Sequence, residues 1–106
     1  MYIIISTTSD CKKTLKKISL AILDAKLSPC IQKYKKIKSL YTWKDEIKYH
    51  DEYKIDIKAQ KLNKNKITKI IKSLHNYENP EIISYEFKIL SVNYEKWFKS
   101  IKNDKS

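Results

Sequence analysis

Polar and apolar residues alternate almost without a break along the segment 47–59, with the period of two that is typical of a half-buried strand. One face carries Ile47, Tyr49, Tyr53, Ile55, Ile57 and Ala59, and the other carries Lys48, His50, Glu52, Lys54, Asp56 and Lys58, with Asp51 as the one break in the row. Together with the preceding segment, this pattern predicts two strands, from about Cys30 to Trp43 and from Ile47 to Ala59, joined at residues 44–46.

The predicted hairpin is longer than the domain that would carry it. An arm of about 13 residues at about 3.3 Å each spans roughly 40 Å, whereas a compact domain of this length is about 33 Å across. We therefore expect the arms to extend beyond the core. An overhanging strand exposes unpaired N–H and C=O groups, and a second copy of the chain is the simplest cover for them. The pattern thus predicts an oligomer.

Three helices and two further strands are expected around the hairpin. The apolar run Met1–Thr7 predicts a buried strand. The polar residues Thr8, Ser9 and Asp10 end this strand and provide the N-cap of a helix. A helical stripe follows and ends before Pro29; it consists of Cys11, Leu15, Ile18, Ile22 and Ala25, widened by Leu20, Leu23 and Leu27. The spacing of Ile67, Ile70, Ile71 and Leu74 predicts a second helix, capped by Asn63 and ending near Asn76.

After Pro80, apolar residues alternate with polar ones from Ile83 to Ile89, which predicts a fourth strand with one wet face. Asn93 is expected to cap a short helix that buries Tyr94, Trp97, Phe98 and Ile101. The order strand, helix, strand, strand, helix, strand, helix predicts an α+β, ferredoxin-like split βαβ sandwich, with one antiparallel sheet and two helices on one face. We expect one domain over residues 1–106, with residues 102–106 as a frayed polar tail.

Composition narrows the range of partners. The formal charge of +11 would ordinarily indicate nucleic acid or an anionic membrane. However, every basic residue is Lys, neither Arg nor Gly occurs, and the lysines fall in every element, as on a solvated surface. Because Arg is preferred for bidentate contacts to phosphates and bases, we expect no specific nucleic-acid partner, only weak and salt-sensitive binding to polyanions.

The expected compartment is the cytoplasm. The chain has no run of 18 or more apolar residues and no export signal, so we expect a soluble protein with no membrane partner. In that compartment Cys11 and Cys30 are expected to be reduced thiols.

Several functions of ferredoxin-like domains need residue types that this chain lacks. An RNA-recognition motif needs a glycine-bearing aromatic strand, and an acylphosphatase-like enzyme needs an arginine-lined phosphate loop. A heavy-metal chaperone needs two closely spaced thiols, whereas Cys11 and Cys30 lie far apart in the sequence. Because no nucleophile and base are legible either, we do not expect an enzyme.

The remaining candidates for a site are polar residues near the second helix and on the hairpin. His75, Tyr77 and Glu81 cluster at the end of the second helix and the entry to the fourth strand, while Glu52 and Lys58 share the polar face of the hairpin. A purely structural interpretation is also open. In it, His75 caps the helix end, Tyr77 packs against the core and Glu52 forms a surface pair with Lys58.

Five segments, in this order and spacing, resemble the CutA divalent-cation-tolerance family. They are KLSPC at Lys26–Cys30, SLYTW at Ser39–Trp43, the pair Glu52 and Lys58, HNYENPE at His75–Glu81, and Tyr94 with Trp97. The resemblance runs from about Ile3 to Ile101. It implies a ferredoxin-like subunit, a PII-like homotrimer whose long hairpins pair across subunits, and a link to divalent metal, usually copper. It also implies an intersubunit cleft that includes Tyr41, Trp43, Glu52, Lys58 and Tyr77.

The metal ligands of the family are only partly retained. The family's cysteine ligand falls on Ser6 and its histidine ligand on Leu74, so Glu81 alone is kept and His75 is the neighbouring imidazole that would substitute. We therefore expect weak or altered binding of copper or zinc, because a soft thiolate is what favours Cu(I). The family's glycine in the hairpin turn is Asp45 here, a residue type that tolerates the left-handed conformation.

Two other functions stay open. One is a PII-like trimeric signalling protein that binds a small anionic effector between subunits through groups such as Lys58, Lys72 and Lys88, although the glycines that phosphate binding commonly uses are absent. The other is a basic, RNA-associated protein whose binding would disappear at physiological salt.

Overall fold

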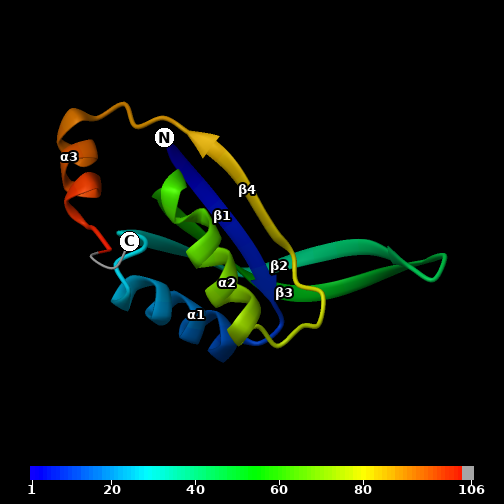
Figure 1. The fold of residues 1–106 in the computed structure, drawn as a ribbon. Coiled ribbons are helices and arrows are strands. Elements are labelled where there is room, and N and C mark those ends of the chain that lie inside the picture. Colours follow the sequence, from blue (N-terminus) through cyan, green and yellow to red (C-terminus); the bar gives the residue numbers. More distant parts are fainter. Residues whose placement is uncertain (104–106) are drawn as a thin grey trace.

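A computed structural model describes residues 1–103, which form a four-stranded antiparallel sheet and its helices (Figure 1). The elements in chain order are β1 (Tyr2–Ser9), α1 (Lys12–Asp24), β2 (Cys30–Trp43), β3 (Glu46–Gln60), the 3₁₀ helix η1 (Lys61–Asn63), α2 (Lys64–Leu74), β4 (Ile82–Phe87) and α3 (Val92–Ser100). The strand order β2-β3-β1-β4, with α1 and α2 on one face, confirms the predicted ferredoxin-like fold.

The core lies between the sheet and the two helices. Residues of β1 and β3 that face the helices are fully buried against apolar residues of α1 and α2. The central members are Ile3, Ile5, Ile55, Ile57 and Ala59 from the sheet and Leu15, Ile18, Ile22, Ile67 and Ile71 from the helices. Fully burying one such side chain stabilises the fold by about 1.5–3 kcal/mol.

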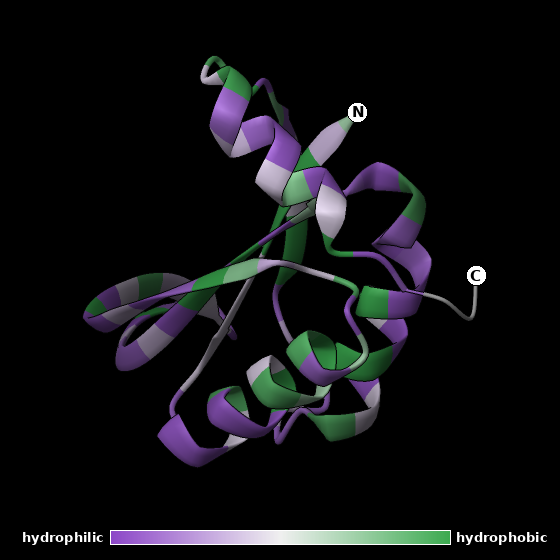
Figure 2. Cartoon of the chain, turned by 90° about the vertical axis from the view of Figure 1, so that its left-hand side faces the viewer, coloured by the Kyte–Doolittle hydropathy of each residue, from purple (hydrophilic) through white to green (hydrophobic). Residues whose placement is uncertain are grey.

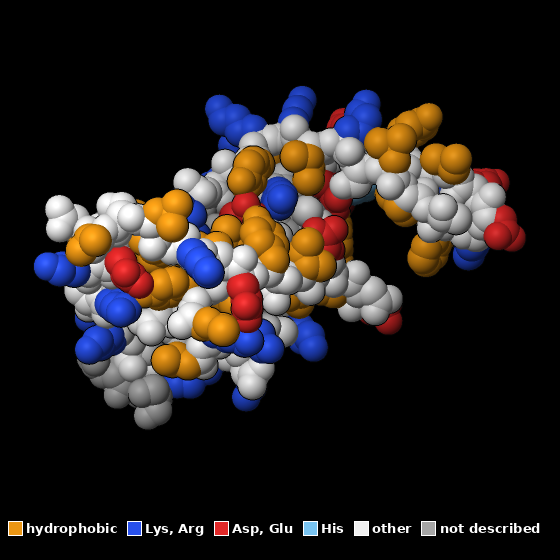
Figure 3. Space-filling model, turned by 90° about the horizontal axis from the view of Figure 1, so that it is seen from above, with side chains coloured by type: hydrophobic (Ala, Val, Ile, Leu, Met, Phe, Trp, Pro, Cys, Tyr) orange, Lys and Arg blue, Asp and Glu red, His pale blue; other side chains and the backbone are white. Residues whose placement is uncertain are grey.

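The hairpin of β2 and β3 extends well beyond this core, as predicted. Within residues 1–103, β1 pairs with β3 only over Tyr53–Gln60, so the outer half of β3, from Glu46 to Glu52, pairs with β2 alone. The molecule measures 47 × 28 × 20 Å, and the hairpin supplies its long arm (Figure 1). Hydrophilic and hydrophobic residues are interspersed along this arm in Figure 2. Its hydrophobic side chains project from the surface in Figure 3.

A two-residue turn closes the hairpin. Trp43 pairs with Glu46, and Lys44 and Asp45 both adopt positive φ, of 51° and 66°. Two successive left-handed residues are typical of the type I′ turn, whose twist matches that of the flanking strands. Asp45 thus takes the left-handed conformation expected of it. The predicted three-residue connection was one residue too long, because Glu46 already belongs to β3.

Two predicted helix caps were wrong. Helix α1 begins after Cys11 rather than at Asp10, and Cys11 makes no side-chain cap. Helix α3 is capped by Ser91, whose hydroxyl accepts a hydrogen bond from the Tyr94 amide, so the expected cap Asn93 lies inside the helix. Asn63 is the N-cap residue of α2, but its side chain donates to the Leu27 carbonyl instead of capping the helix.

Several apolar residues that were expected to be buried are exposed. Leu20 and Leu23 lie on the outer side of α1, 50% and 36% exposed, so the buried stripe of this helix is narrower than predicted. In α3 only Phe98 is buried, and Trp97 is 45% exposed. In β4 it is Ile82 that packs against the core, while Ile83 lies half-exposed on the face of the sheet opposite the helices.

The carboxyl-terminal segment is partly held. Asn103 donates from its side chain to the Ala25 carbonyl at the end of α1 and accepts from Lys66 at 3.2 Å. The rest of the predicted tail, residues 104–106, lies outside the described part of the chain. Within residues 1–103, no helix has both the length and the apolar character needed to cross a lipid bilayer.

Candidate functional site: a cleft beneath the hairpin

An open cleft of about 830 Å³ lies between the hairpin and the loop that joins α2 to β4. Residues from the hairpin, from the end of β1 and from the α2–β4 loop line it. Those used below are Asp10, Ser39, Tyr41, Trp43, His50, Glu52, Tyr77 and Glu81. Four of the five predicted cleft residues therefore share one cavity, while Lys58 is not part of its wall.

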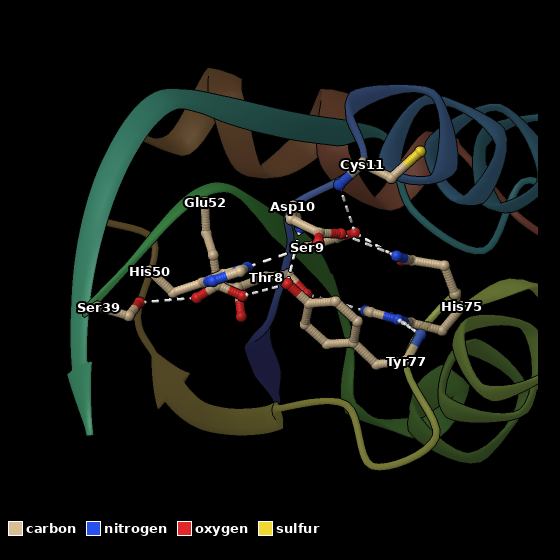
Figure 4. Close-up of polar contacts among 10 residues, drawn as sticks. Thr8, Ser9, Asp10, Cys11, Ser39, His50, Glu52, His75 and Tyr77 are labelled. Atoms are coloured by element: carbon tan, nitrogen blue, oxygen red, sulfur yellow. Dashed lines mark hydrogen bonds and ion pairs between the residues drawn. The ribbon is translucent and has the colours of Figure 1, made fainter. Parts of the chain in front are cut away.

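Glu52 is the centre of the polar contacts in this cleft. Its side chain is on the predicted polar face of β3, yet the residue is only 8% exposed. One carboxylate oxygen accepts from the Ser39 hydroxyl at 2.7 Å and the other from the Tyr77 hydroxyl at 2.7 Å (Figure 4). The Tyr77 hydroxyl in turn accepts from the Asp10 amide at 2.8 Å. We call Ser39, Glu52, Tyr77 and Asp10 the clasp.

The clasp joins three segments that are distant in sequence: the hairpin, the turn between β1 and α1, and the α2–β4 loop. Burial and the bond to Glu52 raise the pKa of the Tyr77 phenol well above its usual range, so the hydroxyl stays protonated and remains a donor. The expected surface pair of Glu52 with Lys58 is not formed. Lys58 instead lies 5.8 Å from the ring centroid of Tyr94.

His75 fixes the loop on which Tyr77 sits. It is the C-cap residue of α2, as predicted, and its Nε2 lies 2.9 Å from the Thr8 carbonyl oxygen. Its Nδ1 accepts from the Tyr77 amide at 3.0 Å, so Nε2 carries the proton and donates to Thr8. Burial lowers the pKa of the ring, which favours the neutral form. The histidine therefore acts through hydrogen bonds and not through a charge on the helix dipole.

A second set of contacts surrounds the clasp. Asn76 accepts from the Ser9 hydroxyl at 2.6 Å and donates to the Asp10 carboxylate at 2.9 Å. His50 Nε2 lies 3.5 Å from the other Asp10 oxygen. The sequence did not indicate these roles, because Asp10 was assigned to a helix cap and His50 only to the polar face of the hairpin. The signal available was a polar run, Thr8 to Asp10, directly after a buried strand.

The residues present do not fit a tight metal site. Glu81 is exposed on the cleft wall, but both ring nitrogens of His75 are already hydrogen-bonded. At the family's other ligand positions, Ser6 donates to the Asp56 carboxylate at 2.6 Å and Leu74 offers no donor. Nowhere in residues 1–103 do three His, Cys, Asp or Glu side chains gather as metal ligands would. The cysteines do not change this, since Cys11 and Cys30 are separate free thiols.

Aromatic side chains form the outer wall of the cleft. Tyr41 and Trp43 are 44% and 58% exposed, and the Lys44 ammonium lies 5.9 Å from the Trp43 ring centroid. The lysines proposed for an anionic effector do not meet here. Lys72 lines a separate hollow of about 300 Å³ between α2 and β4, and neither Lys58 nor Lys88 borders it.

Comparison with known proteins decides the family. The CutA1 divalent ion tolerance protein family matches residues 3–101. The chain belongs to this family. The chain is 29% identical over 100 residues to the probable divalent-cation tolerance protein cutA homolog of Encephalitozoon cuniculi, a match that covers 94% of this chain and 87% of that one. It is also 28% identical over 90 residues to human protein CutA, covering 85% of this chain and 50% of the human one.

Solved CutA1 structures share the whole fold. The rice CutA1 structure superposes with a TM-score of 0.90 at 25% identity, covering 97% of this chain and 94% of that one. CutA1 of Ehrlichia chaffeensis gives a TM-score of 0.87 at 26% identity, covering 94% of each chain. The chain spans about half the length of the human and rice CutA sequences that it matches. The rice relative is named chloroplastic.

Proposed function

We propose that this CutA-family chain is a non-enzymatic cytoplasmic homotrimer in which each hairpin completes the sheet of a neighbouring subunit and covers its cleft. The observation that carries the proposal is the outer half of the hairpin, where β3 pairs on one side only from Glu46 to Glu52. Its apolar side chains are exposed, with Leu40 at 62%, Ile47 at 73% and Tyr49 at 68%. A protein that leaves such an edge bare is prone to uncontrolled strand pairing, so a closed assembly is the stable arrangement.

The assembly is tested by mass in solution. Sedimentation or light scattering should give about 38 kDa, three times the 12.7 kDa of one chain. Ile47→Asp should dissociate the trimer, because it places a charge in the proposed contact. Leu62→Asp is the matched control, since Leu62 is 72% exposed but lies in η1, at the opposite end of β3 from the outer half of the hairpin. A monomeric wild-type chain would refute the proposal.

For the metal, we propose weak and altered binding of copper or zinc at Glu81. The support is a free carboxylate on the wall of a cleft that also carries Asp10 and Glu52. Carboxylates without a thiolate bind such ions weakly. We expect His75 to contribute nothing directly, because its two nitrogens hold Thr8 and Tyr77.

Calorimetric titration of the trimer with copper and zinc tests this point. Glu81→Ala should remove the binding heat. Glu78→Ala is the matched control, because Glu78 is exposed in the same loop but does not line the cleft, and it should leave the heat unchanged. Equal heats for the wild type and Glu81→Ala would remove Glu81 from the proposal. A loss in His75→Ala with Glu81→Ala unchanged would move the site to the histidine.

A further inference from the structure

The positive charge of the chain is concentrated on the helix layer. Helices α1 and α2 together carry eight lysines and one acidic residue, so these two helices contribute +7 of the net +11. The lysines are Lys12, Lys13, Lys16, Lys17, Lys64, Lys66, Lys69 and Lys72, and all eight are exposed. The even spread that the sequence suggested is therefore not what the fold produces. Both helices lie on the same face of the sheet, so their charges form one surface (Figure 1).

The lysines of α1 are not neutralised within the protein. Among residues 1–103, no carboxylate forms an ion pair with Lys12, Lys13, Lys16 or Lys17. Some lysines elsewhere differ, since Lys48, Lys54, Lys61 and Lys99 each lie within 4.0 Å of a carboxylate. The four α1 lysines repel one another, and an anionic partner would relieve that repulsion.

An apolar residue lies on the same exposed face as these charges. Leu20 follows Lys16 and Lys17 by four and three residues, which puts it on the same face of α1, and it is 50% exposed. Leu23, seven residues after Lys16, also lies on this side, while Leu15, Ile18 and Ile22 face the core. The outer face of α1 thus combines lysines with accessible leucines, a combination that suits the boundary between lipid headgroups and acyl chains.

Two classes of polyanion would fit the charge, and the side chains favour one. A single-stranded nucleic acid would need aromatic side chains for base stacking, and α1 and α2 contain none. Bidentate phosphate contacts would need arginine, which the chain lacks. Neither requirement applies to a bilayer, where clusters of four to eight lysines suffice for binding to anionic lipid. We propose that the α1–α2 surface is a docking site for an anionic membrane, with the lysines at the headgroups and Leu20 inserted between them.

Flotation of the full chain with phospholipid vesicles tests this. The protein should float with vesicles of phosphatidylcholine containing about one third phosphatidylserine and not with pure phosphatidylcholine. The triple substitution Lys13→Gln, Lys16→Gln, Lys17→Gln should weaken partitioning about a hundredfold, at about fivefold per lysine. Gln is chosen because it preserves helix propensity. Leu20→Gln should weaken partitioning about tenfold without changing the net charge.

The matched control removes three charges elsewhere. Lys88 directly follows β4, Lys96 and Lys99 lie on α3, and all three are exposed. Replacing all three by Gln should change partitioning less than twofold. Equal weakening by both triple variants would show that only net charge matters and would overturn the docking surface. So would unchanged partitioning of Leu20→Gln, or selective binding to RNA at physiological salt with no flotation. Circular dichroism and solution mass confirm that each variant is folded and assembled, and neither readout depends on metal binding at Glu81.

Discussion

Removing the Tyr77 hydroxyl tests whether the clasp holds the hairpin to the body. Tyr77→Phe deletes the 2.7 Å bond to Glu52 and the 2.8 Å bond from the Asp10 amide and keeps the ring. Asp10 is exposed, so water can replace the second bond at little cost. Glu52 is 8% exposed, so its oxygen loses a donor that water replaces poorly. A hydrogen bond to a charged group contributes about 1.5–3 kcal/mol, so we expect the free energy of unfolding to fall by about 2 kcal/mol.

Urea unfolding at fixed protein concentration measures this loss, because the stability of an oligomer depends on concentration. The thermal midpoint should fall by roughly 10 °C. Tyr85→Phe is the control, since Tyr85 is 50% exposed on β4, outside the hairpin, and it should cost less than about 0.5 kcal/mol. In a double-mutant cycle with Glu52→Gln, the two changes should be coupled by more than about 1 kcal/mol. Additive effects, or a Tyr77→Phe loss no larger than that of the control, would refute the clasp.

Four other measurements test separate parts of the structure. Burial lowers the pKa of His75 below 6.5, so the stability that the neutral ring contributes should be complete above pH 6.5 and be lost as the pH falls below that value. Urea midpoints measured between pH 7.5 and 5 should show this loss, and His75→Gln should make the midpoint depend less on pH. The hydrogen bond to Glu95 raises the pKa of Tyr2 from 10.0 to about 12, so the stability that this bond contributes should be present below pH 10 and be lost between pH 10 and 12. When unfolding is measured over this pH range, Tyr2→Phe should not show the loss. Asp45→Gly should raise the free energy of unfolding by about 0.5–1 kcal/mol in urea titrations, because glycine adopts the turn's φ of 66° without strain, and a decrease would contradict the type I′ turn. Ile57→Ala should lower the same quantity by about 2–5 kcal/mol, because it opens a cavity in a fully buried core, and a loss below 1 kcal/mol would show that the core collapses around it.

The alternation of polar and apolar residues was sufficient to predict the hairpin and the order of the elements. It could not predict how wide each buried stripe is, because width depends on what packs beside the helix. Leu20 and Leu23 continue the apolar pattern of α1, but α2 and the sheet leave them uncovered. The same pattern placed Ile47 and Tyr49 in line with Ile55, although the helices end before they reach the outer half of the hairpin.

The clasp was only half visible in the sequence. Tyr77 and Glu52 were selected as cleft residues, but Glu52 is a residue type that is normally solvated, and nothing local indicates that it is buried. Its burial follows from a tyrosine 25 positions away and from Ser39 on the other arm. His75 was correctly predicted to lie at the helix end, but it acts there through hydrogen bonds and not through a charge on the helix dipole. Its neutrality follows from burial, and its Nε2 hydrogen bond reaches the Thr8 carbonyl, 67 residues earlier; no local pattern reports either.

The central position of β1 constrains how the chain can fold. β1 lies between β3 and β4, and its partners are distant in sequence: Tyr2 pairs with Gln60 on one side and with Phe87 on the other. The β2–β3 hairpin can form from adjacent segments, but β1 has no neighbour until β3 has been synthesised, and its other edge stays unpaired until β4 follows. The entropy of closing such long loops is lost before the strand contacts can stabilise the fold. Folding in milliseconds to seconds is therefore expected. During synthesis, the strand that is most buried in the folded sheet is therefore the one that stays exposed longest.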